Sequence, residues 1–269
     1  MKVFMTGGTG FLGNHLLERL KKLKFEYTVF DKNKHDLFKP QTLKNAISKK
    51  DCIIHLAALH RDQNQNNILH VNVEGTRGVL EAMRLFNPDA KLIFTSSFQV
   101  YVKNNLYGLS KRNAEILIEK YVKKYAFKSV ILRMTNLYGP GYKPFHNSAL
   151  CTFIHQVKNK QVITINGDGS QTRDYLYVDD AVDAIMSSLN YEPRTISYFD
   201  LCTGKKTSLN DIINLLRSIN KDDILVKYNR AVDMDDWGIK KNYKKAAQIL
   251  GWKPKTNLSD GLKLMFSSF

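Results

Sequence analysis

The chain has 269 residues and a net charge of +16, with hydrophobic residues at 43% and charged residues at 25%. This length suits one large α/β domain or a main domain with a smaller partner, and the apolar content excludes a disordered chain. No apolar run reaches the roughly 20 residues that a membrane-spanning helix needs. The positive charge is mostly lysine scattered along the chain. This favours a solvated lysine coat over a nucleic acid or a membrane as partner, and leaves anionic small molecules open.

The cysteine content argues against a structural metal or a disulfide framework. Only Cys52, Cys151 and Cys202 occur, and they are far apart in the chain. We therefore expect no metal site and a reducing environment. A strand pattern starts at Met1, so we expect no signal peptide and a cytoplasmic protein.

Short apolar runs alternate with helical patterns through the first half of the chain. In chain order we expect a strand at 3–6, a helix at 11–23, strands at 27–31 and 52–57, a helix at 71–86, a strand at 91–96, a helix at 110–125 and a strand at 129–133. Apolar strands separated by helices indicate a parallel sheet covered on both faces. Right-handed crossovers would complete a Rossmann-type, doubly wound α/β fold.

The alternation of strand and helix patterns ends after Asn136. Glycine and proline at 139–141 and at Pro144 interrupt the pattern, and short strands, turns and helices follow. We expect a Rossmann domain at residues 1–140 with a return segment at about 172–203, and a smaller C-terminal substrate-binding lobe at 141–171 and 204–269.

A glycine-rich segment, residues 6–13, follows the first strand and opens the first helix. Gly7 permits a tight turn, Gly10 lets the backbone approach a pyrophosphate, and Gly13 allows close packing of the helix. Such a string alone could be only a turn. Its place between a strand and an amphipathic helix predicts a dinucleotide site.

Asp31 ends the second strand eighteen residues after Gly13. A carboxylate at this place accepts hydrogen bonds from the adenosine ribose and repels a 2′-phosphate, so we predict NAD. As a plain turn residue Asp31 would carry no such meaning. Lys32 and Lys34 lie beside it and could tolerate a phosphate, which makes NADP disfavoured rather than excluded.

Ser97 ends a strand, and Tyr107 and Lys111 lie where the next helix begins. A spacing of four places Tyr107 and Lys111 on one helix face. An ammonium near a phenol lowers the phenol pKa from about 10 toward working pH. Tyr107 could then exchange a proton with a sugar hydroxyl while a hydride moves to or from nicotinamide, and Ser97 would hydrogen-bond the same oxygen. This spacing alone is common in amphipathic helices. Because a dinucleotide-binding loop and a strand ending in serine come before it, we interpret Tyr107 and Lys111 as catalytic.

These motifs, with residues 56–58, 72–76, 133–140, 167–175 and 250–254, resemble the extended short-chain dehydrogenase/reductases. Among these, the closest group is the NAD-dependent nucleotide-sugar epimerase/dehydratase family, and the similarity covers nearly the whole chain. The resemblance implies an NAD-binding domain in the first part, a nucleotide-diphosphate sugar as substrate, a homodimer, and a role in glycan precursor synthesis.

The resemblance also implies roles for individual residues. The cofactor residues would be Gly7, Gly10, Phe11, Leu12, Asp31, Asp36, Leu37, Leu56, Ala57, Ala58, His60, Asn72, Thr95, Tyr107 and Lys111. The substrate residues would be Ser97, Asn136, Asn147, Arg173 and Arg230. The two arginines would clamp the diphosphate, because guanidinium forks match phosphate oxygens. Taken alone, either arginine would suit a surface ion pair, and His60 a structural role.

Departures from the family narrow the reaction. Phe98 and Gln99 follow Ser97, where dehydratases carry an acidic pair and decarboxylases a carboxylate at the second position. Without such an acid, elimination loses the group that protonates the leaving hydroxyl. Only five residues separate Tyr101 from Tyr107, a short connection that resembles 4-keto-sugar reductases.

We therefore predict an NAD-dependent nucleotide-sugar 4-epimerase-type oxidoreductase, with a UDP-sugar as the expected substrate. A 4-keto-sugar reductase using NAD(P)H shares every catalytic residue and is the alternative. A non-catalytic NAD(P)-binding sensor is an alternative of another class. A nucleic-acid-binding role is disfavoured because the basic residues are dispersed and lack interleaved aromatics.

Overall fold

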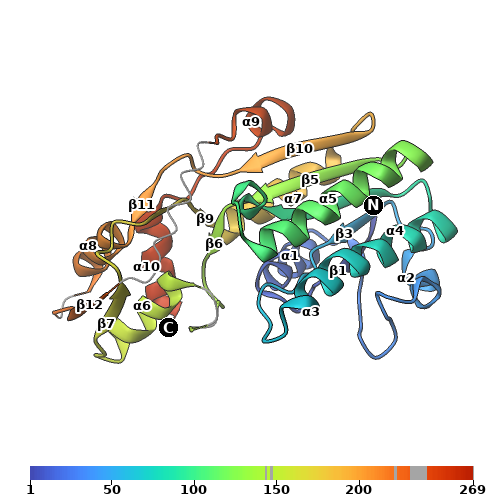
Figure 1. Cartoon of the computed structure of the whole chain (residues 1–269). Coiled ribbons are helices and arrows are strands. Elements are labelled where there is room, and N and C mark those ends of the chain that lie inside the picture. Colours follow the sequence, from blue (N-terminus) through green and yellow to red (C-terminus); the bar gives the residue numbers. More distant parts are fainter. Residues whose placement is uncertain (143, 146–147, 221–222, 231–240, 269) are drawn as a thin grey trace. The chain divides into compact units, whose positions relative to one another are not determined.

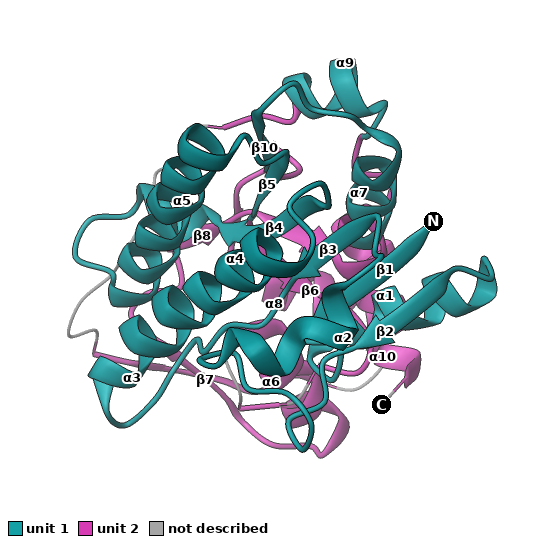
Figure 2. Ribbon diagram, turned by 90° about the vertical axis from the view of Figure 1, so that its right-hand side faces the viewer, with its two compact units in different colours: residues 1–134, 182–201, 244–252 teal, residues 135–181, 202–243, 253–269 magenta. Residues whose placement is uncertain are grey.

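The computed structural model describes residues 1–142, 144–145, 148–220, 223–230 and 241–268 (Figure 1). The chain forms two compact units (Figure 2). The first contains Met1–Met134, Val182–Leu201 and Lys244–Trp252; the second contains Thr135–Ala181, Cys202–Tyr243 and Lys253–Phe269. Each unit has its own secondary structure and is described separately.

The first unit is built on a six-stranded sheet in the order β10-β5-β4-β3-β1-β2. The strands are β1 (Lys2–Thr6), β2 (Glu26–Val29), β3 (Cys52–His55), β4 (Lys91–Ser97), β5 (Ser129–Met134) and β10 (Ile196–Leu201). All neighbouring pairs are parallel. The strand order reverses at β1, which confirms the doubly wound parallel sheet predicted from the alternating pattern.

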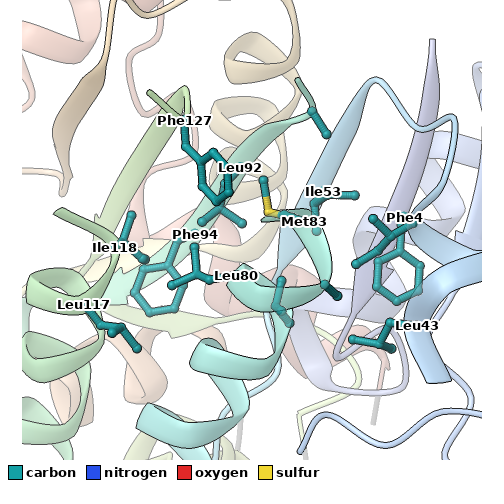
Figure 3. Close-up of a cluster of buried hydrophobic side chains, with 14 of the residues drawn as sticks. Phe4, Leu43, Ile53, Leu80, Met83, Leu92, Phe94, Leu117, Ile118 and Phe127 are labelled. Carbon is teal, nitrogen blue, oxygen red and sulfur yellow. The ribbon is translucent and has the colours of Figure 1, made fainter. Parts of the chain in front are cut away.

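Helices cover both faces of this sheet (Figure 2). On one face, α4 (Gly75–Phe86) and α5 (Leu106–Tyr125) pack on apolar side chains of the strands, including Phe4, Ile53 and Phe94 (Figure 3). On the other face lie α1 (Phe11–Lys22) and α7 (Val178–Asn190), which are joined by an ion pair between Arg19 and Asp183. Buried apolar rows on each helix drive this packing.

The remaining elements of the first unit are short. The connection after β2 holds a 3₁₀ turn, η1 (Pro40–Leu43), and α2 (Lys44–Ile47), and α9 (Lys244–Leu250) lies near the C-terminus. Of the helix expected at 71–86, residues 75–86 form α4, whereas residues 71–74 lie in a π-helical turn, η2 (His70–Glu74), which follows α3 (Gln65–Leu69) and leads directly into α4. The helix expected at 110–125 begins earlier, at Leu106, because the side chain of Asn105 caps it by accepting from the Gly108 N–H.

The second unit contains shorter elements around a separate core. They are β6 (Asn136–Tyr138), α6 (Ala149–Lys158), β7 (Ile163–Asn166), β8 (Thr172–Arg173), β9 (Tyr175–Tyr177), β11 (Thr207–Ser208), α8 (Leu209–Ile219), β12 (Val226–Asn229) and α10 (Leu258–Ser268). The strands form three two-stranded sheets, β11-β8, β12-β7 and β6-β9. Apolar side chains of α6, α8 and α10 join in one buried cluster. Among the described residues of the chain, no helix has the length and hydropathy to cross a membrane.

Candidate active site

The predicted cofactor residues gather at the carboxyl edge of the six-stranded sheet. The glycine-rich segment follows β1, Asp31 comes after β2, and the segment from Leu56 to His60 follows β3. Ser97 is the last residue of β4. Since β2 and β3 lie on opposite sides of β1, the segments after them diverge, and this is where doubly wound sheets bind ligands.

The glycine-rich segment is folded tightly against the end of β3. Gly7 has a φ of +72°, and a Cβ there would lie 2.6 Å from the Ala57 nitrogen. A Cβ on Gly13 would lie 2.1 Å from the Gly7 carbonyl oxygen. Glycine is therefore required at Gly7 by conformation and at both positions by space, which agrees with the turn and the helix packing predicted from the sequence.

The start of α1 offers its backbone to a ligand. Gly10 precedes the helix and has no side chain to cap it. A Cβ on Gly10 would meet only the Gly7 carbonyl oxygen, at 3.3 Å, and Gly10 is exposed. Phe11 and Leu12 are partly buried in the first turn. An exposed helix N-terminus that begins at a glycine and so has no side-chain cap from its N-cap residue suits the two phosphates of a dinucleotide.

The end of β2 carries the predicted ribose ligand. The carboxylate of Asp31 accepts a hydrogen bond from the Asn33 N–H at 3.0 Å, and one oxygen lies 3.8 Å from Lys34 Nζ. The Asp31 side chain is 40% exposed, so ribose hydroxyls can reach it. The ion pair with Lys34 screens the carboxylate in part and leaves NAD favoured over NADP.

Of the two predicted cofactor residues Asp36 and Leu37, Leu37 lies directly against helix α4. The Asp36 carboxylate accepts from the Phe38 N–H at 2.9 Å, and Leu37 packs on the core. A Cβ on Gly78 would lie 1.6 Å from the Leu37 carbonyl oxygen. Only glycine at this position of α4 lets the Leu37 backbone come so close.

The segment after β3 is tied to the sheet and to η2. Ala57 donates its N–H to Thr6 Oγ1 at 3.2 Å, and Leu56 and Ala58 lie beside it. The buried Asn72 side chain accepts from the Leu59 N–H at 2.7 Å and donates to the Leu59 carbonyl at 2.9 Å. This places Asn72 as a brace for the segment that leads to His60.

The three predicted catalytic residues come from β4 and the first turns of α5. Between them, a 3₁₀ turn η3 (Phe98–Tyr101) begins with the Gln99 N–H donating to Ser97 Oγ at 3.1 Å. A Cβ on Gly108 would lie 2.0 Å from the Gln99 carbonyl oxygen. Because Gly108 follows Tyr107 directly, this backbone contact fixes the start of α5 against the turn that carries Ser97.

His60 completes one side of this arrangement. The rings of His60 and Tyr107 have centroids 4.3 Å apart, and Gln99 Nε2 lies 3.3 Å from His60 Nε2. His60 Nδ1 is buried and has no hydrogen-bond partner within the described part of the chain. Burial lowers the pKa of His60 to about 4, so the ring is neutral.

Lys111 is one turn after Tyr107 and is almost completely buried, with 2% of its surface exposed. Its Nζ lies 4.1 Å from the centre of the Phe94 ring, a cation–π contact. Burial lowers the pKa of Lys111 to about 7, and the negative charge of Glu115 opposes this shift. Thr95 is also buried and donates to the His55 carbonyl at 3.4 Å.

These residues fit NAD. Gly7 and Gly13 let the glycine-rich segment pack tightly on the backbone around it, Gly10 adds no side chain at the start of α1, and the buried His60 Nδ1 lacks a hydrogen-bond partner among the described residues. Bound NAD would be held by the glycine-rich segment, Asp31 and the segment after β3. It would supply a nicotinamide ring that accepts and returns a hydride.

The predicted substrate residues other than Ser97 fall in the second unit. Asn136 Nδ2 donates to the Asp174 carbonyl at 3.0 Å, which brings Asn136 close to the strand segment of Arg173. Arg173 is partly buried on β8, and Arg230 is exposed just after β12. Asn147 lies outside the described residues. A common site for these residues therefore stays a prediction.

Sequence reasoning missed three residues of the first unit that shape the site. Gly108 could have been found, because glycine is a poor helix former and its presence in the first turn of a helix indicates close packing there. His55 also left a signal, as the polar end of the otherwise apolar strand β3. Gln99 was considered only for the carboxylate it lacks. No cluster of three or more metal-binding side chains exists among the residues described.

Comparisons with known proteins agree with this geometry. Residues 3–196 match the model of the NAD dependent epimerase/dehydratase family. The chain is 30% identical to a putative UDP-glucose 4-epimerase of Methanocaldococcus jannaschii, over 97% of this chain and 96% of that protein. It is 25% identical to UDP-glucuronic acid decarboxylase 2 of Arabidopsis thaliana, over 100% of this chain and 68% of that protein. The fold matches the structure of a UDP-glucose 4-epimerase from Thermotoga maritima, with a TM-score of 0.89, 24% identity, and coverage of 100% and 98%.

Proposed function

This chain belongs to the NAD dependent epimerase/dehydratase family, and we propose that within it the protein is a nucleotide-sugar 4-epimerase. Membership confirms the predicted family, the prediction of an enzyme, and NAD as its cofactor. The proposal concerns the reaction, the substrate and the roles of the individual residues.

One observation carries the proposal: the residue two positions after Ser97 is Gln99, and its side-chain amide lies 3.3 Å from Nε2 of His60, whose ring contacts the ring of Tyr107. An amide cannot act as the acid that dehydration requires, nor as the carboxylate that decarboxylases carry there. The available chemistry is then reversible oxidation at a sugar carbon bearing a hydroxyl.

In the proposed reaction, Tyr107 accepts the proton of the C4 hydroxyl as the hydride leaves C4. Ser97 donates a hydrogen bond to the oxygen that becomes the ketone, and Lys111 as an ammonium favours the tyrosinate form of Tyr107. The 4-keto sugar then rotates to present its other face, Tyr107 returns the proton to the C4 oxygen, and the hydride returns to the opposite face of C4.

The second unit is proposed to hold the nucleotide diphosphate. Arg173 and Arg230 would bind its phosphates, with Asn136 and Asn147 beside them. The relatives with UDP-sugar epimerase names support a UDP-sugar as substrate. A homodimer and a location in the cytoplasm complete the proposal, and light scattering on the purified protein tests the first.

A second candidate is a 4-keto-sugar reductase that uses exchangeable NADH or NADPH. The observation in its favour is the short connection between β4 and α5, residues 98–105. The two activities differ in how they use the cofactor. An epimerase keeps its NAD because each hydride returns within one turnover, whereas a reductase must release oxidised cofactor and bind reduced cofactor each time.

The cofactor content of freshly purified protein therefore tests the proposal. NAD that survives gel filtration, with interconversion of UDP-glucose and UDP-galactose, is the expected result. In deuterated water the product carries no deuterium at C4, because the hydrogen that leaves C4 is the one that returns. An empty site together with NADPH consumption by a 4-keto sugar would replace the epimerase by the reductase.

Replacement of Tyr107 tests the catalytic assignment. We expect Tyr107→Phe to lower turnover by about 10²–10⁴-fold, the usual contribution of general acid–base catalysis, with NAD binding nearly unchanged. Tyr125→Phe is the matched control, because it removes a hydroxyl from the other end of the same helix. Unchanged turnover in Tyr107→Phe would defeat the assignment. A parent protein inactive on a panel of nucleotide sugars would favour the sensor.

A further inference from the structure

A chain of buried polar side chains lies beneath the candidate active site in the first unit. Its members are almost fully buried, with exposed fractions of 0–3%: Thr6, His55, Asn72, Thr76 and Ser110. They come from β1, β3, η2, α4 and α5, so five elements meet in one polar cluster inside an apolar core. Buried polar groups at this density persist only when their hydrogen bonds are satisfied.

The hydrogen bonds of this cluster fix the position of each proton. Thr76 Oγ1 lies 2.6 Å from the Asn72 carbonyl, which can only accept, so the hydroxyl of Thr76 donates there. His55 Nε2 lies 3.1 Å from Thr76 Oγ1 and must therefore donate to it. His55 Nδ1 then accepts from Thr6 Oγ1, at 2.6 Å, while Thr6 Oγ1 accepts from the Ala57 N–H.

The far end of the chain is equally determined. The Asn72 amide donates to Ser110 Oγ at 2.8 Å, and Ser110 donates to the Tyr107 carbonyl at 2.7 Å. The same amide group holds both backbone groups of Leu59. The two sets of bonds meet at Asn72, the first at its backbone carbonyl and the second at its side-chain amide, and together they connect Ala57 and Leu59, in the predicted cofactor segment, with the backbone of the predicted catalytic tyrosine.

His55 is neutral at the centre of this set. Burial lowers its pKa to about 3, and the positive charge of Lys111 contributes to the same shift. A neutral imidazole has one donor and one acceptor, which are the two roles that Thr76 and Thr6 require. An uncharged ring also adds no second positive charge beside Lys111, which lies over the same Phe94 ring that His55 contacts.

We propose that His55, as an imidazole protonated at Nε2, is a positioning residue for the reaction proposed above. It joins the end of β1 to α4 and, through Asn72 and Ser110, sets where Tyr107 stands relative to the cofactor segment. The inference rests on the proposed function for its catalytic consequence, but the proton arrangement and the effect on NAD binding are independent of which sugar is turned over.

The tautomer is measured on the parent protein labelled with ¹⁵N-histidine, with the His55 ring signals assigned through bonds to its own backbone. Near pH 7, we expect the proton on Nε2 and a bare Nδ1. A proton on Nδ1, or on both nitrogens, would overturn the inference. This measurement needs no variant and therefore survives any variant that fails to fold.

The functional consequence is measured with two variants of Thr76. Thr76→Val keeps the shape and removes the hydroxyl; we expect kcat to fall about tenfold, with KM for the nucleotide sugar changed less than about twofold. Thr76→Ser keeps the hydroxyl and should retain most of the parent's kcat. Ser188→Ala removes another buried hydroxyl, which donates to the Ala184 carbonyl at 2.8 Å in α7, and should leave kcat unchanged.

NAD binding by the same variants separates this inference from the proposed function. Thr76→Val should bind NAD severalfold more weakly than Thr76→Ser, because His55 Nε2 loses its acceptor and the support that His55 and Thr6 give to the Ala57 N–H is loosened. Equal kcat or equal NAD binding in the two variants would overturn the positioning role. An inactive parent that still shows the Nε2 tautomer and the NAD difference would defeat the epimerase proposal and support the inference.

Discussion

The strongest quantitative expectation concerns Lys111, a lysine that is 2% exposed and faces the Phe94 ring. Burial lowers its pKa from 10.5 to about 7. Because the folded-state value lies below the unfolded one, the unfolded chain binds more protons between these two pH values. Folding stability from this group is therefore lowest below pH 7 and rises with pH up to about 10.5. The whole shift corresponds to about 5 kcal/mol at about 1.4 kcal/mol per unit.

The perturbation is Lys111→Met, which keeps an unbranched chain of similar length and removes the titratable amine. Urea unfolding of the NAD-free protein at about pH 7.5 and 9 measures the difference. Between these values, the parent should gain about 2 kcal/mol of unfolding free energy relative to the variant. The variant should be more stable than the parent at the lower pH, since it avoids burying an amine that is partly charged.

Lys123→Met is the control, because Lys123 is exposed on the same helix and its loss should leave the pH slope of the parent. Equal slopes for the parent and Lys111→Met would refute the reasoning. They would show that the pKa of Lys111 is the same in the folded and the unfolded chain, as for a hydrated lysine.

Two further substitutions test how the site is built. Gly78→Ala places a Cβ 1.6 Å from the Leu37 carbonyl oxygen and should lower the free energy of unfolding in urea by about 1–3 kcal/mol. Gly75→Ala, whose Cβ meets Leu37 only at 3.5 Å, should be neutral or stabilising. Equal effects of the two substitutions would contradict the close approach of Leu37 to α4. Tyr101→Phe removes a hydroxyl that donates to Asp200 at 2.7 Å and should destabilise the protein by about 1–3 kcal/mol; an unchanged unfolding midpoint would show that this bond is dispensable.

Residues whose meaning is local were predictable from the sequence. The glycine-rich segment, Asp31 at the end of a strand and the Tyr107–Lys111 spacing each depend on one turn or one helix face, so short-range rules locate them. Most of the parallel sheet was predictable for the same reason, because β1, β3, β4 and β5 each contain a short apolar run. The start of α5 was placed late because the Asn105 cap lies among residues without an apolar period.

Features that depend on distant partners were not predictable. Glu115 is fully buried and binds Arg133 from β5, with Nη2 at 2.7 Å, and Ser96 from β4, with Oγ at 2.6 Å. From the sequence alone Glu115 is one of many charged residues on an amphipathic helix. The depressed pKa of Lys111 likewise depends on how completely the core closes over it, which no spacing of residues reveals.

The short connection after Ser97 can position the site through its backbone or through the side chain of Gln99, and two substitutions distinguish these. Gln99 donates its N–H to Ser97 Oγ and its carbonyl lies close against Gly108 at the start of α5, while its side-chain amide lies within hydrogen-bond distance of His60. Gln99→Ala keeps both backbone contacts, so we expect kcat to fall less than about tenfold, the effect of one modest hydrogen bond.

Gly108→Ala leaves every polar group in place but puts a Cβ 2.0 Å from the Gln99 carbonyl, so the turn and α5 must separate. A displacement of about 1 Å between reacting groups can cost about a hundredfold in rate, which is the loss we expect in kcat. Steady-state kinetics of the two variants decide the matter. If Gln99→Ala is the more damaging, the amide side chain takes part in the reaction, and the site is not held by its backbone.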